Sequence, residues 1–243
     1  MTMRTFLALV LPVVTVGALT ACSAAPEAAS PGSDTKASPA VSAGTGAELR
    51  MVERAGHRLA FHVTPGTRPA IVLDAGGGED SSYWDGIVPR LSEATGAQII
   101  TYDRAGMGGS DEVPGAFDMR AAAEDLGAGL SALGVTRDAI LVSHSQAGEV
   151  ATAYVREHPG VVASAVLVDA NLPPFFTEEQ IARIVAVTKP QNEALEGQPS
   201  TKESRQLIAT ATGYEATRRA YHRMSWPAEV PVTAIVSEKT PFD

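Results

Sequence analysis

The feature that most constrains the fold is residues 139–148, Ala-Ile-Leu-Val-Ser-His-Ser-Gln-Ala-Gly. An apolar run from Ala139 to Val142 ends abruptly in small and polar residues. Apolar side chains then recur at helical spacing from Gln146 to His158. This pattern predicts a strand, a sharp turn and a helix, with Ser145 at the apex of the turn.

The predicted turn gives Ser145 a distinctive setting. Neighbouring turns crowd such an apex, so only small residues fit two positions before it and two and three positions after it. Those positions hold Ser143, Ala147 and Gly148. The Ser145 hydroxyl would stand clear of the sheet, and the backbone N–H of Gln146 would face any negative charge forming beside it. Two interpretations are open, a nucleophilic serine or an ordinary connection whose serine caps the helix.

Residues 1–21 have the order of an export signal. A positively charged start precedes an apolar stretch, Phe6 to Ala18, that is too short to span a bilayer comfortably. The tetrapeptide from Leu19 to Cys22 resembles the lipobox of bacterial lipoproteins, which implies lipidation of Cys22 and anchoring of the exported chain to the bacterial cell membrane. The alternative is an ordinary signal peptide cut near Ala21 or Ala25. Because the sequence has 1 cysteine, no intramolecular disulfide is expected.

The composition of the chain distinguishes a flexible linker from the folded domain that follows it. Residues 22–47 are mostly Ala, Ser, Pro, Gly and Thr, which predicts a flexible linker, and the domain is expected to occupy residues 48–243. An apolar content of 44% fits a globular domain, and a net charge of -9 argues against a nucleic-acid partner. Spacings of His and Cys typical of metal ligands are absent, so no metal or organic cofactor is expected.

Short apolar runs alternate with helical patterns along the domain. The predicted strands are residues 48–55, 57–64, 69–73, 97–102, 139–142, 161–169 and 230–236. The predicted helices are residues 82–95, 119–133, 146–158, 178–187 and 202–223. This alternation predicts an α/β fold, a mostly parallel sheet with helices on both faces.

Two glycine-rich loops follow predicted strands, from Asp74 to Gly78 and from Asp103 to Ser110. Glycine clusters let backbone N–H groups approach a ligand closely, although they also serve as plain turns. Because a parallel sheet binds ligands at the carboxyl ends of its strands, both loops and Ser145 are expected at one edge.

Four segments in this order resemble the α/β-hydrolase superfamily. They are Leu73–Gly78, Tyr83–Trp84, Tyr102–Ser110 and Ser143–Gly148. In the G-x-S-x-G turn typical of that family, small residues here replace both glycines. The resemblance covers roughly residue 48 to the end of the sequence.

The resemblance implies roles for particular residues. Ser145 would be the nucleophile, and the N–H groups of Gln146 and Gly77 would form the oxyanion hole. Asp74 departs from the histidine that often opens this loop in the family, and His144 is expected to be structural. Residues 171–228 would form a helical cap over the pocket. Its aromatic residues would line an acyl or alcohol site or only pack the cap: Phe175, Phe176, Tyr214, Tyr221 and Trp226.

The catalytic acid and base are where the sequence departs from the family. The position that best matches the acid is Thr240, which cannot serve, and Glu238, Asp243 and Asp169 are the alternatives. In the family, the catalytic base is a histidine on a loop that follows one further strand. The five histidines are His57, His62, His144, His158 and His222. Only His222, in the cap, has a plausible path to Ser145. We therefore expect the sequence to lack the last strand, the last helix and the catalytic histidine. This would expose the edge of the strand at 230–236, or of whichever strand the missing one should cover.

Two functions remain open at this point. The first is a cell-surface serine hydrolase that acts on carboxylic esters or related small acyl substrates through an acyl-enzyme. Peptidase, thioesterase, lyase and haloperoxidase-like chemistry are not excluded. The second is a catalytically inactive lipoprotein that keeps the hydrolase fold as a ligand-binding or interaction module.

Overall fold

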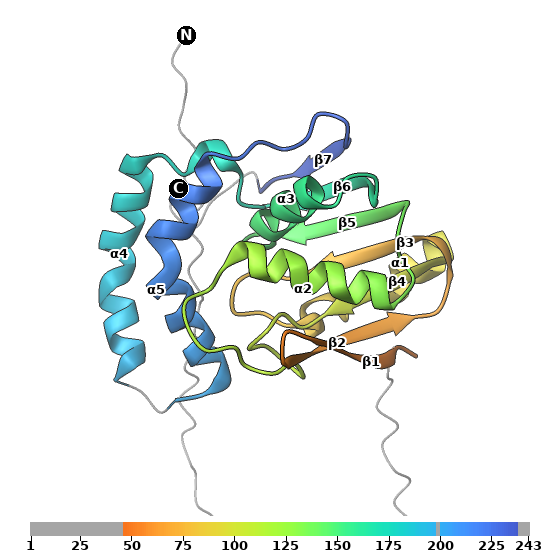
Figure 1. The fold of residues 1–243 in the computed structure, drawn as a ribbon, viewed down its shortest axis with the longest axis horizontal. Helices are drawn as coiled ribbons and strands as arrows, with labels where there is room; N and C mark the ends of the chain where they lie inside the picture. Colours follow the sequence, from red (N-terminus) through yellow and green to blue (C-terminus); the bar gives the residue numbers. More distant parts are fainter. Residues whose placement is uncertain (1–45, 198–199, 238–243) are drawn as a thin grey trace, which may run out of the picture.

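The computed structural model describes residues 46–197 and 200–237. Its centre is a sheet of seven strands in the order β1-β2-β4-β3-β5-β6-β7 (Figure 1). The strands are β1 (Glu48–Arg54), β2 (His57–Thr64), β3 (Thr67–Asp74), β4 (Ala97–Tyr102), β5 (Ala139–His144), β6 (Val162–Val168) and β7 (Val232–Ile235). β1 and β2 pair antiparallel with their neighbours, and all other pairs are parallel. The predicted mostly parallel sheet is confirmed.

Helices cover both faces of this sheet. They are α1 (Val88–Thr95), α2 (Met119–Ala132), α3 (Ala147–Glu157), α4 (Glu178–Glu196) and α5 (Lys202–His222), with short 3₁₀ turns η1 (Ser81–Trp84) and η2 (Pro173–Phe175). Figure 1 shows α2 and α3 side by side against one face, and the α4/α5 pair beside the ends of the strands.

The alternation of side chains along β3 divides the core into two layers. Ala70 and Val72 point into the cluster formed with α2 and α3. Ile71 and Leu73 point the other way, into the cluster that contains Val88 of α1. A strand with both faces apolar needs cover on both sides, which explains why the buried run in β3 lies between two helical layers.

Strand order places the functional edge of the sheet. The chain passes from β3 to β4 on one side and returns to place β5 on the other side of β3. At such a reversal the loops after the two neighbouring strands diverge and leave room for a ligand. Here those strands are β3, which ends at Asp74, and β5, which is followed by Ser145.

Three predicted elements differ from the structure. The helix predicted at 82–95 is instead η1 followed by α1, because Pro89 has no N–H to continue a helix from the preceding turn. The helix predicted at 178–187 extends to Glu196, through Pro190. The strand predicted as buried at 230–236 is limited to β7. All four of its residues are exposed, because strand side chains point to the two faces of the sheet and no described helix packs closely on this strand.

Candidate active site

The turn between β5 and α3 holds Ser145 in a backbone conformation that is rare for residues with a Cβ. Its φ is 51°, in the left-handed region. The Ser145 N–H donates to the carbonyl of Val168 (3.1 Å), and the Ser145 carbonyl accepts from the N–H groups of Gly148 (3.1 Å) and Asn171 (2.8 Å). The end of β6 and the loop after it therefore hold the turn in place. The predicted strand, turn and helix are confirmed.

The surroundings of Ser145 are as crowded as predicted. The residue is 3% exposed, and its Oγ has no hydrogen-bond partner among the described residues. Ser143 and Ala147 are also buried. A Cβ on Gly148 would lie 2.5 Å from the carbonyl oxygen of Asn171, so a larger residue would displace the backbone. The hydroxyl is thus held in a dry position without a competing partner.

Gln146 and Gly77, the residues predicted to form the oxyanion hole, lie against each other. Gln146 directly follows Ser145 and is the N-cap of α3, so its N–H lies at the positive end of the helix dipole. A Cβ on Gly77 would overlap Oε1 of Gln146, so a larger residue would displace the end of the Gln146 side chain. The structure brings these two residues together, as expected from the strand order.

Arg104 fixes the loop that contains Gly77. Its guanidinium donates to the carboxylate of Asp74 and to the carbonyls of Ala75 and Gly76. In a trans peptide the N–H points opposite to the carbonyl. The Gly77 N–H therefore faces away from Arg104, and the loop is oriented before any ligand arrives.

The pair of Asp74 and Arg104 is buried at both ends. Burial raises the pKa of Asp74, and this rise is opposed by the charge of Arg104 and by the hydroxyl of Tyr102, which donates to the carboxylate at 2.8 Å. Burial alone would lower the pKa of Arg104, but the Asp74 carboxylate more than offsets it. The guanidinium therefore stays protonated at neutral pH.

His144 is held on the opposite side of the same loop. Its Nδ1 lies 3.2 Å from Oε2 of Glu79, which also accepts the Gly76 N–H at 2.8 Å. The ring of Tyr83 stacks on the imidazole with a centroid separation of 4.7 Å. Burial alone would raise the pKa of Glu79, but the hydrogen bonds from His144 and Gly76 hold it below its usual value.

Asp103 organises the second glycine-rich loop. Its carboxylate accepts the N–H of Ser81 (2.8 Å) and of Gly109 (2.7 Å), and it lies 3.4 Å from Nε2 of His62. Burial would raise its pKa, but the hydrogen bonds, that of His62 foremost, lower it to about 2. Asp103 is therefore ionised at neutral pH and joins the two loops at the rim.

Among the three candidate acids, Asp169 lies in the described region. It follows β6 with a φ of 42°, and its carboxylate accepts the N–H (2.6 Å) and the hydroxyl of Ser237. Since Ser145 bonds to Val168, the backbone of Asp169 is next to the turn. Glu238 and Asp243 lie outside the described residues.

All five histidines are described, and none hydrogen-bonds to Oγ of Ser145. His57 lies 3.1 Å from Asp125, and His158 packs on Tyr154. Nδ1 of His222, the residue with the predicted path to the serine, lies 3.0 Å from the carbonyl oxygen of Pro173. The structure does not bring any of them into contact with the serine hydroxyl.

The aromatic residues of the cap pack together. Phe176 and Tyr221 are 2% and 0% exposed in a cluster with residues of α4, and Phe175 and Tyr214 pack against it. The indole of Trp226 donates to the carbonyl of Val230 at 2.8 Å. The structure thus favours the packing interpretation for these residues.

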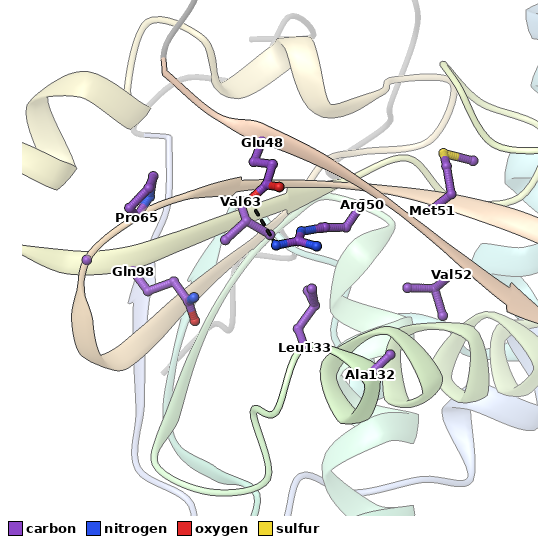
Figure 2. Close-up of a pocket in the computed structure, with 10 residues that line it drawn as sticks. Glu48, Arg50, Met51, Val52, Val63, Pro65, Gln98, Ala132 and Leu133 are labelled. Carbon is purple, nitrogen blue, oxygen red and sulfur yellow. Dashed lines mark hydrogen bonds and ion pairs between the residues drawn. The ribbon is translucent and has the colours of Figure 1, made fainter.

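A hollow of about 540 Å³ lies away from this site (Figure 2). Its lining includes Gly66 and Gln98, close to the starts of β3 and β4, and Leu133 at the end of α2. It is therefore at the amino ends of the parallel strands, opposite the edge where sheets of this kind bind ligands. None of the predicted site residues lines it.

The comparisons with known proteins agree with the fold. The model of the alpha/beta hydrolase fold family matches residues 69–194, and the chain belongs to this family. It is 34% identical over 116 residues to the uncharacterized protein Rv2715 of Mycobacterium tuberculosis, covering 48% of this chain and 33% of that protein. It is 44% identical over 84 residues to a non-heme chloroperoxidase of Streptomyces lividans, covering 34% of this chain and 30% of that protein.

The chain thus spans about a third of the length of these curated relatives. An esterase from Exiguobacterium antarcticum superposes with a TM-score of 0.56 at 18% identity, covering 76% of this chain and 79% of the esterase. At that identity the superposition shows a shared fold.

Cys22, the predicted signal and most of the predicted linker precede the described residues. Within residues 46–197 and 200–237, no helix has the length and apolarity needed to cross a membrane. In the same residues, no three His, Cys, Asp or Glu side chains are grouped as metal ligands.

Sequence reasoning missed the charged residues that order the site. Arg104, Glu79 and the buried pair of Glu149 and Arg218 were not predicted to take part. One signal was available, because Asp74, Asp103 and Arg104 come at or directly after the ends of buried strands, where a charge needs a partner. Their partners lie far away in the sequence, so the spacing of residues does not reveal them.

Proposed function

We propose that this chain is the catalytic part of a serine hydrolase that acts on carboxylic esters or related small acyl compounds. The observation that carries the proposal is the left-handed conformation of Ser145 at the apex of a buried turn, with Oγ free of partners. Strained backbone of this kind is concentrated at functional sites. An ordinary helix cap would instead use its hydroxyl to accept an N–H of the helix.

In the proposed reaction, Oγ of Ser145 attacks the acyl carbonyl, the bond between the carbonyl carbon and the ester oxygen breaks, and the serine proton passes to that oxygen as the alcohol leaves. The N–H groups of Gln146 and Gly77 stabilise the oxyanion, and water then hydrolyses the acyl-enzyme. Asp169 is the candidate acid best supported by its place, at the end of the strand beside β5. Export through residues 1–21 and anchoring to the cell membrane by lipid on Cys22 are part of the same proposal.

A fluorophosphonate probe, which forms a covalent bond with an activated serine, tests the nucleophile directly. We expect the protein purified from its native host to be labelled, and the Ser145→Ala variant to remain unlabelled. Ser143→Ala is the matched control, because Ser143 is equally buried two residues away, and its labelling should persist. Labelling that survives in Ser145→Ala would refute the assignment.

A second candidate function is supported by the histidines, none of which bonds to Ser145. Without a base, a serine hydroxyl is a weak nucleophile at neutral pH. In this case the fold serves as a module that binds a small acyl compound without turnover. Tight binding of an ester analogue, together with no labelling of the wild-type protein, would favour this function over catalysis.

A further inference from the structure

A buried ion pair joins the cap to the helix that follows Ser145. Glu149, in the first turn of α3, is 0% exposed, and Arg218 of α5 is 4% exposed. The two side chains form an ion pair through Arg218 Nη1 and Glu149 Oε2. The guanidinium also lies over the rings of Phe176 (4.9 Å) and Tyr214 (4.6 Å).

This pair is a poor means of stabilising the fold. Removing two charges from water is costly, and apolar residues of the same volume often stabilise a protein as well or better. Burial lowers the pKa of Arg218 to about 9, which still leaves the guanidinium charged at neutral pH. In some proteins a buried pair instead fixes a single arrangement of the elements that it joins.

Asn171 connects this ion pair to the backbone of Ser145. The Asn171 side chain donates to Oε1 of Glu149, and its N–H donates to the Ser145 carbonyl at 2.8 Å. The carbonyl of Asn171 accepts the hydroxyl of Tyr221 at 2.7 Å. Tyr221 belongs to α5 and is fully buried. Glu149 and Tyr221 thus hold the side chain and the carbonyl of Asn171, and the backbone N–H of Asn171 bonds to the turn.

We propose that Arg218 and Tyr221 of the cap are positioning residues for the nucleophile, acting through Glu149 and Asn171 on the backbone of Ser145. The cap then supports the left-handed turn in addition to covering the site. This inference depends on the proposed function only for its kinetic readout, since the support itself is a property of the backbone.

The test uses two changes that remove little volume. Tyr221→Phe deletes one hydroxyl, and the double variant Glu149→Gln with Arg218→Met removes both charges, so that no unpaired charge remains in the interior. Arg219→Met is the matched control, because Arg219 is the next residue of α5 and pairs with Glu178 and Glu215 at the surface. A cooperative urea-unfolding transition in each variant establishes that the variants being compared are folded.

The first readout is hydrogen exchange of the backbone amide of Asn171, a measurement that does not depend on catalytic activity. Because one hydrogen bond is worth about 1 kcal/mol, we expect exchange to be about fivefold faster in Tyr221→Phe and in the double variant, and unchanged in Arg219→Met. Exchange in both variants equal to that of the control would overturn the inference.

The second readout is the rate of fluorophosphonate labelling as a function of probe concentration. We expect the maximal rate to fall about tenfold in both variants while the half-saturating concentration stays the same, because the buried groups do not contact the probe. Unchanged maximal rates with a labelled wild type would overturn the inference and leave the proposed function intact. An unlabelled wild type would contradict only the proposed function, and hydrogen exchange would still decide the inference.

Discussion

The central strands of the sheet and its outermost parallel strand differ in how firmly their surroundings hold them. The residues that end or follow β3, β4 and β5 are nearly inaccessible, with Asp74 3%, Arg104 5% and Ser145 3% exposed. On β7, Val232 and Ile235 are 47% and 55% exposed. The candidate nucleophile and the loop facing it therefore lie in the most buried part of the fold, whereas Asp169 borders the least buried part.

This difference in burial explains why the geometry of the nucleophile is better defined than that of the candidate acid. At the centre, the backbone of Ser145 and the charged side chains of Asp74 and Arg104 have partners from other elements, so their positions follow from the packing of the core. At the edge, the carboxylate of Asp169 is held by Ser237, in the segment directly after β7. The geometry of the nucleophile is well defined for this reason, and that of the acid rests on a single neighbouring segment.

The largest expected effect comes from breaking the central pair. Arg104→Met should lower the free energy of unfolding by about 3–5 kcal/mol, because it leaves the Asp74 carboxylate buried without its cation. The matched change at the sheet edge is Arg50→Met, whose partner Glu48 is exposed, and it should change stability by less than about 0.5 kcal/mol. Urea unfolding measures both, and similar losses would break the comparison.

A smaller effect is expected where α2 packs on the sheet. A Cβ at Gly129 would overlap the ring of Phe61, so Gly129→Ala should destabilise the protein by roughly 1–3 kcal/mol although alanine is the better helix former. Gly86→Ala is the control, since no atom lies within 4 Å of its added Cβ. The midpoint of thermal unfolding should be lower for Gly129→Ala than for Gly86→Ala. A midpoint of Gly129→Ala equal to that of the wild type would show that the interface between α2 and β2 accommodates the added methyl group.

Asp103 should contribute to the pH dependence of the free energy of unfolding. Its pKa is lowered from 3.8 to about 2 in the folded protein, so its contribution is present above the unfolded pKa and is lost as pH falls toward 2. Allowing for screening by water, we expect a loss of about 1 kcal/mol. Unfolding free energies of wild type and Asp103→Asn, measured from about pH 5 to about pH 2.5, should show a shallower acid dependence in the variant. Parallel curves would contradict the assignment.

The smallest effect is expected next to the outer strand. Val236 is 73% exposed, so Val236→Ser should change the free energy of unfolding by less than about 0.5 kcal/mol. It should also reduce self-association, measured by sedimentation, because an apolar patch beside a strand edge that no described strand covers favours pairing between chains. A loss above about 1 kcal/mol would mean that Val236 is covered in solution.

Much of the fold could be predicted because its signals are local. The apolar runs of β3, β4 and β5 and the helical spacing of α2, α3 and α5 depend on residues a few positions apart. The turn at Ser145 was predictable for the same reason, since the small residues that it requires are its close neighbours. The parallel order then placed the glycine-rich loops beside it.

Contacts between distant residues decided the rest. The clamp of Arg104 on Asp74 and the pair of Glu149 and Arg218 join separate elements, and no pattern within one element contains them. The break between η1 and α1 and the exposure of β7 likewise depend on what packs against each segment. The sequence by itself determined most of the strands and helices and the residue at the apex of the turn, because periodicity and small residues act locally. Only the tertiary structure decided which charges order the site, because burial and pairing depend on the whole fold.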